Sequence, residues 1–112
     1  MHPEKSLTTW TLSLKDRILL NAETERACKI THREKKFLVA LTQAKDNILE
    51  SWELCDLLVD KEDARPMNKH SLEEFVRRLR KKIESNSGEA AKGALKSVWG
   101  LGYQLCISII LK

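Results

Sequence analysis

The sequence lacks any long apolar segment. Hydrophobic residues make up 42% of its 112 residues, yet no run of them approaches the roughly 20 residues that a membrane span requires. Residues 1–5 also lack the apolar core of a signal peptide. The length suits one ordinary domain whose core needs no disulfide bonds. We therefore expect a cytoplasmic, single-domain protein over residues 1–112, with a core at 10–107 and a flexible segment at 1–9.

Glycine, cysteine and histidine are scarce, and their spacing excludes several kinds of site. The four glycines lie in the last quarter of the chain and form no glycine-rich phosphate loop. Cysteines and histidines are scattered, whereas a metal site needs paired ligands at short spacing. The sequence therefore predicts no metal, no cofactor, no small-molecule substrate and no enzymatic activity. The cysteines lie within hydrophobic patterns and are predicted to be small buried residues: Cys28, Cys55 and Cys106.

What the chain does contain is a strongly basic helix. Leu72, Val76, Leu79 and Ile83 recur at steps of four, three and four residues, so they form one apolar stripe. Residues 71–83 hold five cations and two acids, a net charge of +3 out of the +4 of the whole chain. A surface of one sign attracts polyanions and releases their counterions, which favours nucleic acid as the partner. The alternative is a basic face that is merely solvated.

The first half of the chain predicts a small sheet followed by two helices. Residues 10–14 alternate apolar and polar, and 18–20 and 27–30 are short apolar runs, which indicates an amino-terminal antiparallel sheet. Thr31 and Glu34 fit a capping box that opens a first helix, ending near residue 42. Ser51 is the expected cap of a second helix that ends near residue 59.

The second half predicts a loop, the basic helix and a hairpin. Residues 60–69 lack periodicity, and Pro66 discourages helix at the preceding residue. The basic helix follows at 71–84, with Ser71 as its cap and Glu74 three residues later. Residues 94–98 and 102–107 form the closing hairpin. The predicted fold is therefore α+β: a winged helix-turn-helix with a small amino-terminal sheet, three helices and a carboxy-terminal β-hairpin wing.

The order of these elements and the motifs of the basic helix and the wing resemble the OmpR/PhoB-type winged-helix DNA-binding domain of bacterial transcriptional regulators. The resemblance covers residues 10–105 and is most specific at 76–83 and in the pattern Val98-x-Gly100-x-Gly102-Tyr103-x-Leu105. It implies that the basic helix lies in the major groove of double-stranded DNA. The predicted DNA-binding residues are His70, Ser71, Glu74, Phe75, Arg77, Arg78, Arg80, Lys81, Lys96, Ser97 and Trp99, of which Glu74, Phe75 and Trp99 depart from the pattern of the family.

These residues are predicted to have different roles, some implied by the resemblance and some by their chemistry. Arg78 is implied at base edges, and its planar fork can donate two hydrogen bonds to guanine. Arg77 and Arg80 are implied near phosphates. Glu74 can accept a hydrogen bond from cytosine or instead stabilise the amino end of the helix, and Phe75 can contact a thymine methyl group.

The remaining implied contacts lie at the start of the helix and in the wing. His70 and Ser71 are implied at the DNA backbone, as is Lys81 from its charge. Trp99 stands where many relatives carry an arginine that enters the minor groove, so the expected wing contacts to phosphate are Lys96 and Ser97. The indole of Trp99 packs across the wing base or lies against the DNA backbone in this interpretation.

Outside the DNA-binding residues, two segments leave alternatives open. Asp60, Glu62 and Asp63 lie in the loop that touches RNA polymerase in some relatives, although mixed-charge loops are usually only solvated connections. The apolar residues 106–112 are either a last strand of the sheet or the start of a further domain or membrane segment. No receiver domain is contained in the chain, which is a cut-out effector domain, a stand-alone regulator or part of a larger sensor.

The predicted function is sequence-specific binding of double-stranded DNA in a two-component-type transcriptional regulator. Two copies, as a homodimer on DNA, are expected on direct-repeat half-sites. The alternative is a winged-helix module for protein–protein contact with weak or no DNA binding, which Trp99, Phe75 and the two glutamates near the reading surface favour.

Overall fold

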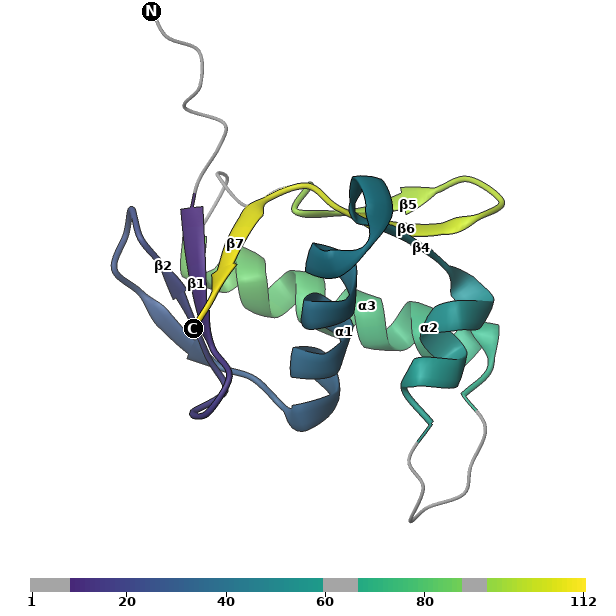
Figure 1. Ribbon diagram of the computed structural model, residues 1–112, viewed down its shortest axis with the longest axis horizontal. Coiled ribbons are helices and arrows are strands. Elements are labelled where there is room, and N and C mark those ends of the chain that lie inside the picture. The colour runs from purple at the N-terminus through teal and green to yellow at the C-terminus, as the bar shows by residue number, and fades with distance from the viewer. Residues whose placement is uncertain (1–8, 60–66, 88–92) are drawn as a thin grey trace, which may run out of the picture.

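The computed structural model describes residues 9–59, 67–87 and 93–112 (Figure 1). Of the predicted flexible segment 1–9, residues 1–8 lie outside these ranges, whereas Thr9 is the first residue of the first strand. In chain order the elements are β1 (Thr9–Ser13), β2 (Ile18–Asn21), β3 (Ala27–Lys29), α1 (His32–Gln43), the 3-10 turn η2 (Lys45–Asn47), β4 (Ile48–Glu50), α2 (Ser51–Leu57), α3 (Lys69–Ser87), β5 (Leu95–Val98), β6 (Gly102–Leu105) and β7 (Ser108–Leu111).

The amino-terminal sheet has four strands in the order β3-β2-β1-β7. β2 runs antiparallel to both β1 and β3, as predicted. β7 comes from the other end of the chain and lies parallel to β1, with Trp10 opposite Ile109 and Leu12 opposite Leu111. Residues 108–111 therefore form a last strand of the sheet, which was one of the two alternatives for the segment 106–112.

The wing is a three-stranded sheet in the order β4-β6-β5, close to the predicted hairpin. Its third strand, β4, was not expected, because Ile48 and Leu49 followed a polar segment and their partners on β6 are more than fifty residues away in the sequence. Gly102 allows the close approach of β6: a Cβ there would overlap the Leu49 carbonyl oxygen and lie 2.7 Å from Cα of Glu50. The wing is thereby fixed to the start of α2.

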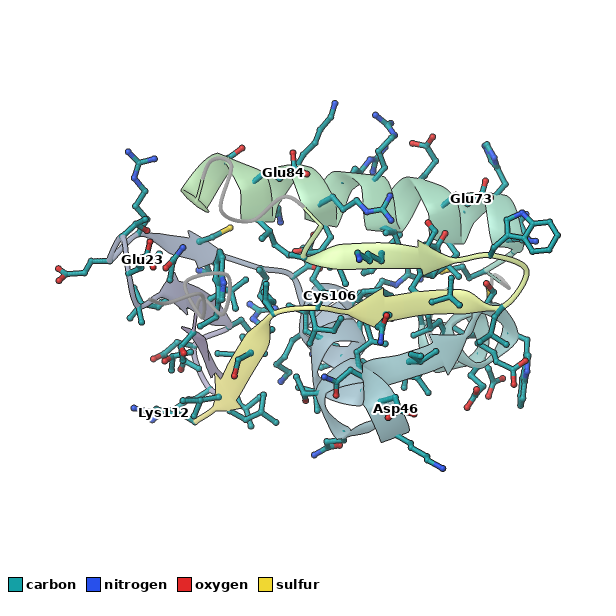
Figure 2. All side chains as sticks on the ribbon, turned by 90° about the horizontal axis from the view of Figure 1, so that it is seen from above. Glu23, Asp46, Glu73, Glu84, Cys106 and Lys112 are labelled. Carbon is teal, nitrogen blue, oxygen red and sulfur yellow. The ribbon has the colours of Figure 1, made fainter. Side chains whose placement is uncertain are left out.

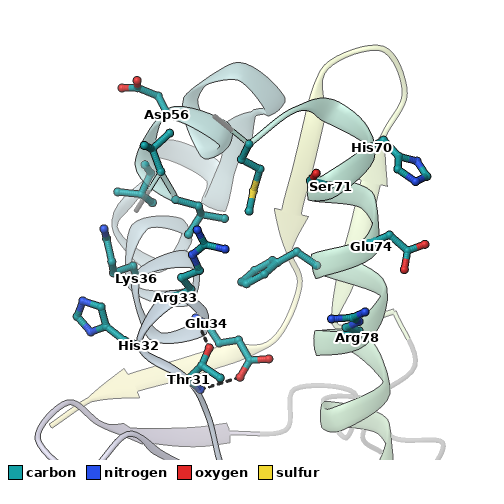
Figure 3. A pocket seen from close by; sticks show the side chains of 15 residues that line it. Thr31, His32, Arg33, Glu34, Lys36, Asp56, His70, Ser71, Glu74 and Arg78 are labelled. Atoms are coloured by element: carbon teal, nitrogen blue, oxygen red, sulfur yellow. Dashed lines mark hydrogen bonds between the residues drawn. The ribbon is translucent and has the colours of Figure 1, made fainter. Parts of the chain in front are cut away.

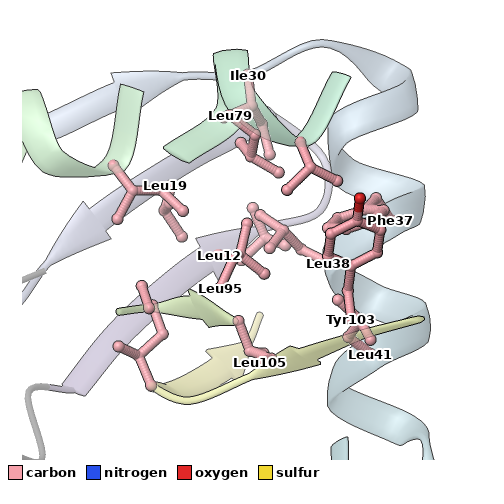
Figure 4. Close-up of a cluster of buried hydrophobic side chains, with 14 of the residues drawn as sticks. Leu12, Leu19, Ile30, Phe37, Leu38, Leu41, Leu79, Leu95, Tyr103 and Leu105 are labelled. Carbon is pink, nitrogen blue, oxygen red and sulfur yellow. The ribbon is translucent and has the colours of Figure 1, made fainter. Parts of the chain in front are cut away.

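One hydrophobic core lies between the two sheets and the three helices (Figure 4). Helix α3 contributes the predicted stripe, and Leu72, Val76, Leu79 and Ile83 are each at most 1% exposed. Burial of such a side chain stabilises the fold by about 1.5–3 kcal/mol. The outward side of α3 is consequently fixed by the burial of its opposite side.

The capping box of α1 is present as predicted, but two other predicted caps are wrong. The N-cap of α2 is Glu50, which forms a capping box with Glu53, and Ser51 is the first helical residue. Helix α3 begins at Lys69, two residues before the predicted start at 71, because the Asn68 side chain accepts the backbone N–H of Ser71 at 2.8 Å. Asn and Ser are both favourable caps, so sequence alone did not separate the two starts.

The prediction that all three cysteines are buried is also wrong. Cys106 is exposed, and Cys28 and Cys55 are only half-buried. Cys106 lies in the short connection between β6 and β7, outside the apolar alternation of either strand. Burial raises the pKa of the Cys55 thiol.

Candidate nucleic-acid interface

The outward side of α3 carries most of the predicted DNA-binding residues. His70, Arg77, Arg78 and Lys81 are exposed on this side, opposite the buried stripe. Figure 2 shows that the helix runs beside the wing, with Glu73 and Glu84 along its length. A helix that presents cations along one side can meet a polyanion over several turns.

Arg77 is already paired within the protein. Its guanidinium Nη2 donates to Oε1 of Glu74 at 2.7 Å, and both side chains are about half exposed. The hydrogen bond from Arg77 is the main cause that lowers the pKa of Glu74. A surface pair of this kind contributes little to stability, but it orients Arg77 and reduces the net positive charge of the surface.

Phe75 points toward the protein. Its ring packs edge-to-face on Phe37 of α1, with ring centroids 5.3 Å apart and an interplanar angle of 63°. The side chain is half-buried and lines the depression between α1 and α3. Aromatic pairs of this geometry favour the packed position. Phe75 therefore fixes the distance between the two helices, and a contact with a thymine methyl group would compete with this packing.

Arg80 connects α3 to the wing. Its Nε donates to the Leu95 carbonyl oxygen at 2.8 Å, and its Nη2 donates to Oγ of Ser97 at 3.1 Å. Two of the residues predicted to contact phosphates thus make hydrogen bonds to each other. The link sets the position of β5 relative to the outward side of α3.

At the end of the wing the backbone turns between β5 and β6. The Leu101 N–H donates to the Val98 carbonyl oxygen at 2.9 Å, and Gly100 adopts a φ of +70°, a conformation that favours glycine. Trp99 in this turn is 98% exposed, so it does not pack across the wing base. Lys96 is exposed on β5.

A groove lies on the side of α3 that faces away from the wing, between α1, the end of α2 and α3 (Figure 3). We call it the α1–α3 groove. Its lining includes the predicted residues His70, Ser71, Glu74, Phe75 and Arg78. It also includes three α1 residues that the sequence did not single out, namely His32 and the cations Arg33 and Lys36. The sequence shows basic residues spaced along α1. Only the packing of α1 beside α3 shows that they border the same groove as residues of α3.

Beneath this groove, α1 and α3 are joined by an ion pair. Oε1 of Glu34 accepts the backbone N–H of Thr31 at 2.8 Å and the Nζ of Lys82 at 2.7 Å. Glu34 is only 5% exposed, so its charge is compensated by these donors. One carboxylate therefore both caps α1 and fastens it to α3.

The predicted polymerase-contact residues Asp60, Glu62 and Asp63 lie outside the described residues. Within residues 9–59, 67–85 and 93–112, no group of three His, Cys, Asp or Glu side chains could hold a metal ion. Across the same part of the chain, no helix is long and apolar enough to cross a membrane.

Comparisons with known proteins agree with this geometry. The family model described as "Transcriptional regulatory protein, C terminal" matches residues 25–105. Among solved structures, the DNA-binding domain of E. coli CadC is similar in fold, with a TM-score of 0.68 and 19% identity over 84% of this chain and 82% of that chain. The search of curated proteins found no match.

The family match covers more than half of the chain, and members of the family are non-enzymatic domains. The predictions of a winged-helix fold and of no enzymatic activity are therefore confirmed. The chain belongs to the family of OmpR/PhoB-type carboxy-terminal domains, the DNA-binding effector domains of transcriptional regulators.

Proposed function

We propose that the domain binds double-stranded DNA sequence-specifically, with α3 in the major groove and the wing against the neighbouring backbone or minor groove. The main support is the outward side of α3, where exposed cations stand opposite a fully buried stripe. An α-helix with its side chains is about 10–12 Å wide, and the major groove is about 12 Å wide. Because its buried stripe fixes α3 to the core, α3 can enter the major groove without moving relative to the core.

The cations of α3 then divide into two roles. The Arg78 side chain is exposed and makes no hydrogen bond to any residue that the structure describes, so its fork is available for guanine O6 and N7. Arg77, Lys81 and His70 lie beside it and suit phosphates, which give affinity but no sequence information. Arg80 and Ser97 contact the backbone from a position that their mutual hydrogen bond fixes.

The wider context of this function is also part of the proposal. Two copies bind direct-repeat half-sites, and the regulator is of the two-component type. Asp60, Glu62 and Asp63 contact RNA polymerase beside the bound site. The domain acts in the cytoplasm, where bacterial DNA is located.

Selection of duplexes from a random library tests the proposal. The enriched duplex is then titrated by fluorescence anisotropy at several salt concentrations. We expect enrichment of a repeated motif and an affinity that falls steeply with salt, because each neutralised phosphate contributes about −0.9 to the slope of log K against log salt. Absence of both enrichment and salt-dependent binding, even with two half-sites, would refute the proposal.

A second candidate function is contact with another protein. Trp99 and Trp52 are 98% and 66% exposed, and both line one depression between α2 and the wing. Exposed tryptophans are enriched at protein interfaces. A Trp99→Arg variant tests the role of this side chain on DNA: if the variant gains affinity for duplexes with A·T-rich flanks and the natural domain does not, Trp99 is not inserted into the minor groove. Trp99→Ala without effect on DNA affinity would further favour the protein-contact function.

A further inference from the structure

We propose that the α1–α3 groove binds the sugar-phosphate strand that flanks α3 on the side away from the wing. Arg33 and Lys36 of α1 then form a second phosphate-binding site, separate from the wing. The inference rests on the proposed function, since it requires α3 to lie in the major groove.

The two long sides of α3 are covered by different elements. On one side, Arg80 bonds to Leu95 and Ser97 of the wing. On the other side, Phe75 packs on Phe37 of α1, and Lys82 pairs with Glu34. A duplex that receives α3 in its major groove presents one strand to the wing and the other strand to α1.

Charges in the groove are arranged for an anion. Glu34 and Glu74 are paired with Lys82 and Arg77, which leaves Asp56 as the remaining acid of the lining that the structure describes. The side chains of Arg33 and Lys36, by contrast, make no hydrogen bond or ion pair with any described residue. Together with Arg78 they give the described lining an excess of unengaged cations (Figure 3).

The position of these cations favours DNA over an acidic peptide. Arg78, which we place at base edges, lines the same groove as Arg33 and Lys36. A strand beside the bases read by Arg78 therefore passes the two α1 cations without any rearrangement of the helices. Half or more of protein–DNA hydrogen bonds go to phosphate and sugar, so such a flanking site is chemically expected.

The test uses an Arg33→Gln/Lys36→Gln double variant, which keeps most of the apolar stems and removes both charges. Lys35→Gln is the matched control, because Lys35 is on the same helix but donates to the Leu14 carbonyl oxygen at 3.4 Å and does not line the groove. Each protein is titrated by anisotropy with the enriched duplex and with a scrambled duplex at several salt concentrations. Circular dichroism melting checks that the variants are folded.

The double variant is expected to bind both duplexes more weakly by the same factor, with sequence preference unchanged. Its salt slope should be smaller than that of the natural domain by about 1.8, corresponding to two lost phosphate contacts. Duplexes with one uncharged methylphosphonate at successive positions then locate the contact. The natural domain should lose affinity at phosphates on the side away from the wing, and the double variant should be insensitive there.

Failure of the inference can be distinguished from failure of the proposed function. If the natural domain binds no duplex, both fail. If the natural domain binds its site but the folded double variant has the same affinity and salt slope, only the second phosphate site is refuted. The second phosphate site would also be refuted if Lys35→Gln weakened binding as much as the double variant does. The loss would then come from the lower net charge and not from contacts in the groove.

Discussion

On the outward side of α3, single charges are partly compensated before any ligand is bound. Glu74 holds Arg77 at 2.7 Å, whereas Arg78 has no such partner among the described residues. Sequence placed all three on the exposed side, because the buried stripe fixes the helical phase. It could not show which arginine is engaged, since an i,i+3 contact depends on side-chain conformation.

Substitution of Glu74 by glutamine is expected to strengthen binding to every duplex. The change removes an acid that faces phosphates and releases Arg77 from its ion pair. Anisotropy with cognate and scrambled duplexes measures the effect. Glu73→Gln, one residue earlier on the same turn, is the control for net charge. A loss confined to one C·G position would instead show that Glu74 reads cytosine.

Acid titration should also detect the ion pair between Glu74 and Arg77. Because Arg77 lowers the pKa of Glu74, the carboxyl group is expected to become protonated at a lower pH than it would without this pair. The favourable interaction is present above the unfolded-state pKa and is lost only as pH falls through the lower folded-state value. NMR titration of the Glu74 carboxyl group should give a pKa below that in Arg77→Ala. Equal values in the two proteins would contradict the pair.

At the scale of the elements, the wing is held in place by backbone hydrogen bonds to β4 and to the start of α2. The Ser51 N–H donates to the Leu101 carbonyl oxygen at 3.0 Å, and β4 pairs with β6 beside it. Helices α1 and α3 were predictable because periodicity and a capping box identify them locally. β4 was not, because a three-residue strand has no pattern of its own and depends on a distant partner.

Gly102→Ala should destabilise the domain by about 1–3 kcal/mol, the usual cost of forcing extra atoms into a packed site. The new methyl group would meet backbone of β4 and α2, which cannot rotate away as a side chain could. Gly100→Ala is the matched control. It has open space and only the cost of its positive φ, so we expect a smaller loss. Urea unfolding measures both, and equal stability of Gly102→Ala and the natural domain would contradict the close approach.

Over the whole molecule, the two ends of the described chain meet in one sheet. β7 pairs with β1, and Ile109 and Leu111 pack against the core from the same side as Trp10 and Leu12. The resemblance in the motifs of α3 and the wing predicted the winged-helix fold. It left the last strand undecided, because seven apolar residues suit a strand as well as the start of another segment.

Ile109→Ala and Leu111→Ala should each lower the free energy of unfolding by about 1–2 kcal/mol, since full burial of such a side chain contributes about 1.5–3 kcal/mol and these two are half-buried. Ile110 lies between them and is 48% exposed. Its replacement by alanine should change stability by less than about 0.5 kcal/mol. Urea denaturation checks this alternation, and equal effects at the three positions would contradict the pairing of β7 with β1.

The central claim is that α3 reads DNA sequence through Arg78. The most direct measurement compares the natural domain and Arg78→Ala on the enriched duplex and on every single base-pair variant of it. We expect Arg78→Ala to lose about 1–3 kcal/mol on the enriched duplex and to lose discrimination at one G·C pair, with other positions unchanged. An equal loss on every duplex, with discrimination intact at all positions, would contradict the claim and leave Arg78 as a phosphate contact.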